Sequence, residues 1–152
     1  MKIVSTNRKA RHNYHILETF EAGIELKGME VKSLRNKGCS LDGSFARIEH
    51  EEMFLYNMNI SEFDKSSYFK VDPKRTRRLL LHKKEIKKLI GTATQKGLTL
   101  VPLRVFFNDK GWAKIEIALA RGKKSYDKRR KLKEDIAKRE AERAMKKYRR
   151  KY

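Results

Sequence analysis

Apolar and polar residues alternate along much of the first 120 residues, and this alternation predicts β-strands. The strongest prediction is a strand over 98–107, in which every second residue is apolar. The residues expected to face the core there are Val101, Leu103, Val105 and Phe107. Pro102 cannot donate a backbone hydrogen bond, so we expect a sheet edge or a bulge beside it. The turn 108–111 then leads into an antiparallel strand over 112–120, which places Lys114 on the outer face.

Shorter segments of the same pattern predict the rest of the sheet. Residues 14–20 and 24–27 are expected to form a first hairpin around a tight turn between them. Residues 45–49 and 53–60 predict a second pair of strands, whose aromatic residues are interpreted as core rather than as a base-stacking platform. A short buried strand is expected at 79–81. About six strands at this spacing predict a mainly-β fold, a small antiparallel OB-like β-barrel with two to three helices and a basic C-terminal tail.

Two helices are predicted from apolar residues at helical spacing. The first, over 29–36, ends before a glycine and leaves Lys32 and Arg35 in solvent. The second starts near His82 and is closed by Gly97, with lysines on the face opposite its apolar stripe. That lysine face adds a basic surface to the predicted sheet.

Glu30 has two interpretations that the residues alone leave open. It lies in the first turn of the predicted helix 29–36, where a carboxylate stabilises the helix dipole. A lone acid in a basic protein can also accept a hydrogen bond from a base or from a ribose hydroxyl. The first interpretation is structural and the second is functional.

The charge of the chain indicates what this fold binds. Lys and Arg number 39 against 19 Asp and Glu, which gives a formal net charge of +20. Residues 121–152 alone hold 16 basic and 5 acidic residues. Such an excess implies a polyanionic partner, and nucleic acid is the leading candidate, with an anionic membrane surface as its rival.

Two basic segments of the body are candidates for contact with nucleic acid. The first directly precedes the strand at 79–81 and contains Lys74, Arg75, Arg77 and Arg78. A charge run is often only a solvated face, but a run braced against a buried strand favours phosphate contacts. The second is 7–13, basic and aperiodic, which is either a frayed terminus or an edge that contacts phosphates.

Several functional classes lack the residues that they need. Cys39 is the only cysteine and the four histidines are scattered, so we expect no disulfide framework and no zinc site. The sequence has no Gly-rich phosphate loop and no nucleophile motif, so we predict a protein that is not an enzyme and uses no cofactor. Without an apolar stretch of membrane-spanning length or a signal peptide, we expect a cytoplasmic protein with no membrane partner.

The segment after Gly122 is predicted to be a separate arm, dividing the chain into a body at 1–121 and a tail at 122–152. Its few large apolar residues cannot build a core, so we expect disorder in the free protein. Acid-to-base pairs at i and i+4 favour a helix once a polyanion neutralises the like charges; these are Glu134–Lys138, Asp135–Arg139 and Glu142–Lys146. A merely solubilising tail is the alternative.

Five ordered motifs give the sequence a family resemblance. They are Asn-Arg-Lys-Ala-Arg-His at 7–12, Phe-Glu-Ala-Gly-Ile at 20–24, Glu-Val-Lys-Ser-Leu-Arg at 30–35, Arg-Arg-Leu-Leu-Leu-His at 77–82 and Gly-Lys-Lys-Ser-Tyr-Asp-Lys-Arg at 122–129. In this order and spacing the chain resembles the SmpB family, bacterial proteins that bind transfer-messenger RNA. The resemblance covers essentially the whole chain.

The resemblance implies a monomeric, non-enzymatic partner of trans-translation. An OB-like barrel would hold the tRNA-like domain of transfer-messenger RNA and deliver it, with elongation factor Tu and GTP, to stalled ribosomes. The tail would enter the empty mRNA channel near the decoding centre, and the nascent chain would be tagged. A generic RNA-binding or ribosomal protein with a basic extension is the alternative.

The resemblance also assigns residues, and it favours the functional interpretation of Glu30. Together with the basic segments, the predicted RNA-binding residues are Asn7, Arg8, Lys9, Glu30, Lys32, Arg35, Arg75, Arg77, Arg78, Leu80, His82 and Lys114. The predicted ribosome-acting residues of the tail are Gly122, Lys123, Lys124, Tyr126, Asp127, Lys128 and Arg129. The family often has His where this chain has Tyr126, so an aromatic face for stacking is kept and a titratable imidazole is not.

Overall fold

A computed structural model of the chain describes residues 1–62, 71–93, 97–123 and 125–151. It divides into two units, Met1–Gly122 and Lys123–Tyr152. The first unit holds the sheet and the core, and the second is a single helix.

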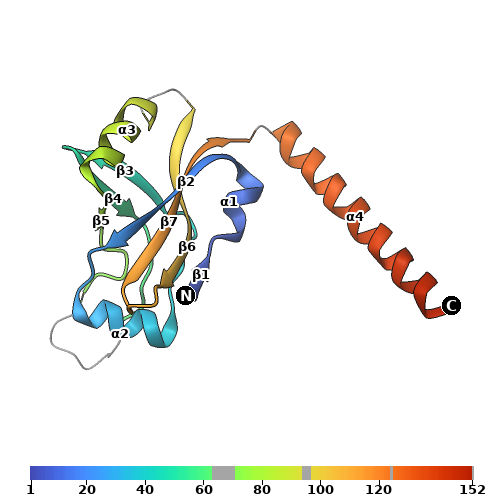
Figure 1. Ribbon diagram of the computed structural model, residues 1–152, viewed down its shortest axis with the longest axis horizontal. Coiled ribbons are helices and arrows are strands. Elements are labelled where there is room, and N and C mark those ends of the chain that lie inside the picture. Colours follow the sequence, from blue (N-terminus) through green and yellow to red (C-terminus); the bar gives the residue numbers. More distant parts are fainter. Residues whose placement is uncertain (63–70, 94–96, 124, 152) are drawn as a thin grey trace. The chain divides into compact units, whose positions relative to one another are not determined.

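Antiparallel pairing organises the first unit. Within the described residues its strands are β1 (Lys2–Thr6), β2 (Tyr14–Ile24), β3 (Phe45–Glu49), β4 (Glu52–Tyr56), β5 (Arg77–Leu80), β6 (Leu98–Phe107) and β7 (Ala113–Gly122). They follow the order β1-β6-β3-β4-β5-β2-β7, and β6 pairs with β7 as well (Figure 1). The order from β6 to β7 therefore closes into a ring of strands, with β1 added on β6. The mainly-β, OB-like antiparallel fold predicted from the sequence is confirmed.

The β6–β7 hairpin was the strongest prediction, and its strands and turn are confirmed. Ile115, Ile117 and Leu119 of β7 lie in the main apolar core, on the face where the alternation placed them. The amide of Asn108 donates to the carbonyl of Trp112 and closes the turn at 3.0 Å. Residues of β7 pair with β6 on one side and with β2 on the other.

The prediction of a single inward face on β6 is wrong. The register shifts between Pro102 and Arg104, which confirms the expected bulge. Val105 and Phe107 face the main core, whereas Val101 and Leu103 pack in a second cluster. The members of that second cluster are Ala10, Val101, Leu103, Ala118 and Ala120. A bulge moves the side chains that follow it to the other face, so one alternation could not hold along the whole strand.

The N-terminal segment is ordered secondary structure, so its interpretation as a frayed terminus is wrong. It forms β1 and the short helix α1 (Arg8–Asn13). Ala10 is buried in the second apolar cluster and packs α1 against the body. The amide of Asn7 donates to the carbonyl of Leu103 at 2.7 Å, and its side chain donates to the carbonyl of Pro102 at 2.9 Å.

The predicted first hairpin is also wrong, because β2 continues without a turn through residues 21–23. In that stretch Ala22 pairs with Ile115, and Gly23 pairs with Lys114. The long neighbour β7 provides backbone partners that override the local turn preference of a glycine. Similarly, β4 ends at Tyr56 rather than at residue 60, because Asn57 adopts a left-handed backbone with φ of 65°.

Two further helices flank the sheet. Helix α2 (Gly28–Lys37) has the predicted orientation, with Leu34 buried and Lys32 exposed. It ends where Gly38 adopts a φ of 78°, which favours glycine. Helix α3 (Lys83–Ala93) buries Ile86 and Leu89, as its apolar stripe predicted. The polar composition of 61–72 predicts a loop there, and most of it, 63–70, lies outside the described residues.

The second unit contains α4 (Ser125–Lys151). Its large apolar side chains are exposed; these are Leu132, Ile136, Met145 and Tyr148. Arg130 and Glu134 form an ion pair one helical turn apart, at 3.3 Å. The disorder of the free tail stays a prediction. No helix in the described part of the chain is both long enough and apolar enough to span a membrane.

Candidate nucleic-acid interface

Two predicted RNA-binding residues, Leu80 and Lys114, lie in one row across the sheet on either side of Gly23. Gly23 of β2 pairs with Leu80 of β5 on one side and with Lys114 of β7 on the other. Residues that pair across strands project from the same face, so Leu80 and Lys114 flank a position with no side chain. A Cβ atom on Gly23 would lie 3.3 Å from the Cβ of Leu80. Glycine is therefore what keeps the space between Leu80 and Lys114 open.

That space is part of a shallow hollow of about 630 Å³. Its lining residues are Gly23, Ile24, Leu26, Val31, Leu80, Lys110, Gly111, Trp112, Ala113 and Lys114. Trp112 is 66% exposed and Leu80 is 48% exposed, and both are large apolar side chains in a strongly basic protein. An aromatic face and an apolar edge beside lysines can contact a nucleotide's base and its phosphate together.

Glu30 does not face this hollow with a free carboxylate. It is 3% exposed and lies against Arg77, which is 0% exposed. The Nε of Arg77 donates to Oε2 of Glu30 at 2.7 Å, and Arg75 donates to Oε1. The amide of Lys27 also donates to Oε1, at 3.0 Å. Glu30 therefore holds the start of α2 to the segment that leads into β5.

Arg77 completes the connection on its other side. Its Nη1 donates to the carbonyl of Met58 at 2.6 Å and its Nη2 to the carbonyl of Pro73 at 3.0 Å. Burial by itself raises the pKa of the Glu30 carboxyl, but the hydrogen bonds from Arg75, the Lys27 amide and Arg77 outweigh it and lower the pKa. The carboxylate thus stays charged inside the protein.

The exposed run of cations expected at 74–78 is only partly present. Burial alternates along β5, so Arg77 and Leu79 point inward while Arg78 and Leu80 point outward. The strand at 79–81 was predicted from three consecutive leucines, whereas the observed strand covers Arg77–Leu80, and the alternation that includes Arg77 was missed. Of the other predicted cations in this segment, Lys74 and Arg78 are exposed and Arg75 is half-buried against Glu30.

The other end of α2 is attached to the turn that carries Trp112. Nη2 of Arg35 donates to the carbonyl of Gly111 at 3.2 Å. The guanidinium of Arg35 also lies over the ring of Phe107, 5.0 Å from its centroid. Arg35 therefore supports the edge of the hollow, while Lys32 on the same helix is exposed.

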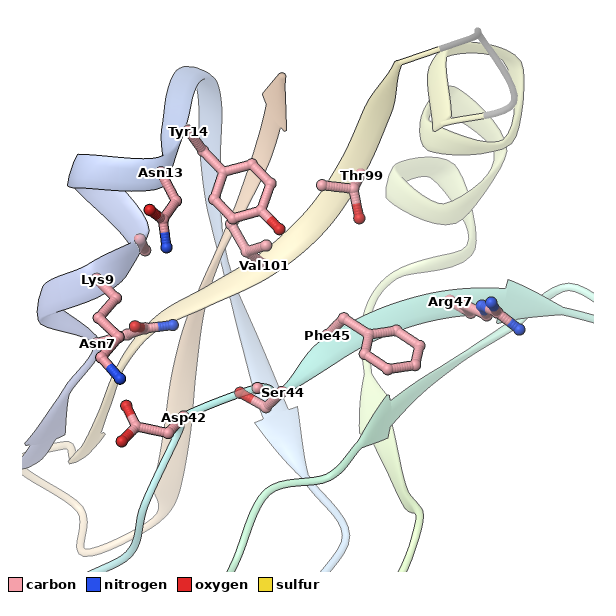
Figure 2. A pocket seen from close by; sticks show the side chains of 12 residues that line it. Asn7, Lys9, Asn13, Tyr14, Asp42, Ser44, Phe45, Arg47, Thr99 and Val101 are labelled. Carbon is pink, nitrogen blue, oxygen red and sulfur yellow. The ribbon is translucent and has the colours of Figure 1, made fainter. Parts of the chain in front are cut away.

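The remaining predicted residues lie elsewhere. His82 is exposed between β5 and α3. Arg8 is exposed on α1, whereas Asn7 and Lys9 line a second pocket and not the hollow (Figure 2). In the tail segment, Gly122 ends β7 opposite Tyr14.

The predicted ribosome-acting residues after Gly122 fall at the start of the second unit. Lys124 lies outside the described residues, and so do the side chains of Tyr126, Asp127 and Lys128. Lys123 is half-buried and Arg129 is exposed on α4. No group of three or more His, Cys, Asp or Glu suited to a metal ion occurs in the part of the chain that the structure describes.

Sequence reasoning also missed two residues of the hollow. Gly23 was assigned to a turn. Its place within a strand depends on Leu80 and Lys114, which pair with it from distant parts of the sequence. Trp112 was placed at the start of a strand with no function, although a solvent-exposed tryptophan next to a predicted turn is a binding signal.

Comparisons with known proteins bear on the whole chain. The model of the SmpB protein family matches residues 4–147. An SsrA-binding protein of Pelotomaculum thermopropionicum is 56% identical over 146 residues, covering 96% of this chain and 95% of the relative. One from Thermus thermophilus is 55% identical over 142 residues, covering 93% of this chain and 99% of the relative.

The fold agrees with these matches. A chain in a solved structure described as "tmRNA-SmpB: a journey to the center of the bacterial ribosome" superposes with a TM-score of 0.68 at 57% sequence identity. The superposition covers 80% of this chain and 85% of that one. Near-complete coverage at this identity includes the strands that form the hollow, and the chain belongs to the SmpB family.

Proposed function

We propose that this protein binds the tRNA-like domain of transfer-messenger RNA and delivers it to stalled ribosomes for trans-translation. Its relatives are SsrA-binding proteins, and the similar solved structure is of a tmRNA–SmpB assembly on the ribosome. The protein acts by binding RNA in the cytoplasm and not as an enzyme. The observation that carries the proposal is the row Leu80–Gly23–Lys114 on a body that belongs to the SmpB family.

The row defines how the body would engage RNA. Lys114 would neutralise a phosphate, while Leu80 and Trp112 would cover the apolar face of a base or ribose. Lys32 is exposed on α2 and adds a positive charge, whereas Arg78, also exposed, is paired with Glu52 at 3.2 Å. Such an interface recognises the shape of a folded RNA that presents a base or ribose to it, rather than a short free strand.

Glu30, Arg75, Arg77 and Arg35 would contribute by positioning. They connect both ends of α2 to β5 and to the β6–β7 turn, and these elements carry Leu80 and Trp112. The carboxylate of Glu30 accepts hydrogen bonds from two arginines and one backbone amide. Its importance for RNA binding would therefore be indirect.

The second unit would act on the ribosome. Helix α4 presents a strongly basic surface, and its few large apolar side chains, among them a leucine, an isoleucine and a methionine, are exposed. Such a helix fits a channel of ribosomal RNA, so we propose that it occupies the empty mRNA channel near the decoding centre. Elongation factor Tu with GTP would accompany the monomeric protein as part of the delivered complex.

Separating the two units tests this division of labour. A chain that ends after Gly122 keeps the sheet, the hollow and both apolar clusters. We expect it to bind transfer-messenger RNA with unchanged affinity and to give no tagged peptide on stalled ribosomes supplied with elongation factor Tu and GTP. Loss of RNA binding in the shortened chain would contradict the proposal, and so would full tagging activity.

A further inference from the structure

The ring of strands has an open seam between β3 and β6. These two strands pair at a single position, Ala46 with Leu100, although each is long enough for more. Beside the seam lies a pocket of about 350 Å³, bounded by α1, the start of β3 and the start of β6 (Figure 2). This volume lies at the lower end of the range of about 300–1,000 Å³ for small-molecule sites.

We propose that this pocket takes one unpaired nucleotide of RNA. The inference rests on the proposed function only in that the ligand belongs to an RNA. It adds a second contact point, because none of the residues that line the pocket also lines the hollow around Gly23.

Two aromatic rings form the walls of the pocket. Tyr14 packs on the second apolar cluster, and its ring projects into the pocket with the hydroxyl toward Thr99 (Figure 2). Phe45 stacks on Tyr56 with 5.3 Å between ring centroids, and the guanidinium of Arg47 lies 5.2 Å from its centroid. Tyr56 and the Arg47 guanidinium thus already lie on the Phe45 ring, so the surface offered to a base is the ring of Tyr14, and every base has a face that can stack.

Polar groups at the pocket are available to a ligand. Four side-chain groups at the pocket have no hydrogen-bond partner within the described part of the chain. They are the ammonium of Lys9, the side-chain amide of Asn13 and the hydroxyls of Tyr14 and Thr99. These groups supply donors and acceptors for a base edge and for the sugar. Lys9 and Arg47 supply the positive charge that a phosphate requires.

Asp42 distinguishes a nucleotide from a bare anion. Its carboxylate stands at the rim of the same pocket (Figure 2). A carboxylate repels free phosphate, so it argues against a simple anion site. It accepts hydrogen bonds from the N–H groups of a base edge, so it suits a nucleotide whose base carries such donors.

The test uses the full-length, 15N-labelled chain and a single-stranded ribotrinucleotide too short to resemble a tRNA-like domain. We expect amide shifts at Asn13, Tyr14 and Thr99, and none at Gly23 or Lys114. Two parallel titrations use inorganic phosphate and a duplex containing the same three bases. The proposal is overturned if phosphate alone gives the same shifts, if the duplex gives them equally, or if the trinucleotide shifts only the hollow.

Variants then separate stacking from charge. Loss of the ring in Tyr14→Leu should weaken trinucleotide binding about tenfold, the scale expected for one stacked base, whereas Tyr14→Phe should keep most of the affinity. Lys9→Ala should weaken binding, and Lys84→Ala on α3 is the matched lysine control that should not. If Tyr14→Leu fails to fold, the single variants Thr99→Val and Lys9→Ala test the pocket instead. Unchanged trinucleotide affinity in both of these variants overturns the proposal.

The two proposals can fail separately. Leu80→Ala should weaken binding of transfer-messenger RNA and leave trinucleotide binding intact. A protein that discriminates transfer-messenger RNA but shows no trinucleotide shifts at the pocket would overturn the pocket alone. Trinucleotide shifts at the pocket without that discrimination would support the pocket and overturn the proposed function.

Discussion

Arg77 lies buried against Glu30, with 2.7 Å between the Nε of the arginine and Oε2 of the glutamate. Both side chains are buried, since Glu30 is 3% exposed and Arg77 is 0% exposed. Glu30, assigned to RNA binding by the family resemblance, and Arg77, a candidate from the basic segment, thus form a buried ion pair beneath the surface that would bind the RNA. RNA binding by the surface above them therefore depends on the stability of this ion pair.

Replacing Glu30 should destabilise the fold strongly. Glu30→Ala leaves the guanidinium of Arg77 buried without its partner, which costs about 3–5 kcal/mol. Urea denaturation followed by circular dichroism measures the change. Glu18→Ala removes an exposed ion pair with Lys88 and is the control, with an expected loss of at most about 1 kcal/mol. A Glu30→Ala protein as stable as the wild type that no longer binds RNA would contradict the positioning role.

The same pair should give the fold a specific sensitivity to acid. The pKa of Glu30 is lower in the folded chain than its ordinary value of 4.5. Its stabilising contribution is therefore present above that ordinary value and is lost as the pH falls through the folded pKa. The difference in unfolding free energy between the wild type and Glu30→Gln should be constant near neutral pH and should shrink below 4.5. A difference that grows in acid would show that the carboxyl is neutral in the folded chain.

Leu80 should matter to RNA binding and little to folding. Its side chain is about half exposed beside Gly23, so Leu80→Ala should change the unfolding free energy by no more than about 0.5 kcal/mol. Affinity for transfer-messenger RNA should fall, because the apolar edge of the hollow is lost. Leu17→Ala is a matched control, since Leu17 is a similarly exposed leucine on β2. Equal effects of the two substitutions on affinity would remove the hollow from the interface.

Replacing Lys114 should reduce the salt dependence of RNA binding. If it neutralises one phosphate, the slope of log affinity against log salt concentration becomes smaller by about 1 in Lys114→Ala. Fluorescence anisotropy at several salt concentrations measures the slope. An unchanged slope would mean that Lys114 does not contact a phosphate, even if the affinity changes.

The parts of the fold that could be predicted are those where one local pattern decides the structure. The β6–β7 hairpin and α2 follow from alternation or helical spacing, together with a turn or a terminating glycine. Lys114 was correctly placed on the outer face for the same reason. The pairing of Gly23 between Leu80 and Lys114 needed long-range partners, which a local pattern does not contain.

The errors have one physical source, which is burial by distant segments. Ala10 is buried only because β6 and β7 present a second apolar patch formed by Val101 and Ala118. In the sequence, Arg77 has the pattern of a solvated cation, because its partner Glu30 is 47 positions away. A sequence shows which residues can be buried, and the closure of the ring determines which of them are.

The central claim is selective binding of transfer-messenger RNA, and an RNA competition at one fixed salt concentration tests it most directly. Labelled transfer-messenger RNA bound to the full chain would be displaced by unlabelled transfer-messenger RNA, by an ordinary tRNA, or by an unrelated hairpin of similar length. We predict that transfer-messenger RNA competes best and that Leu80→Ala removes most of its advantage. Equal competition by all three RNAs would contradict the claim and leave a generic RNA-binding protein with a basic extension.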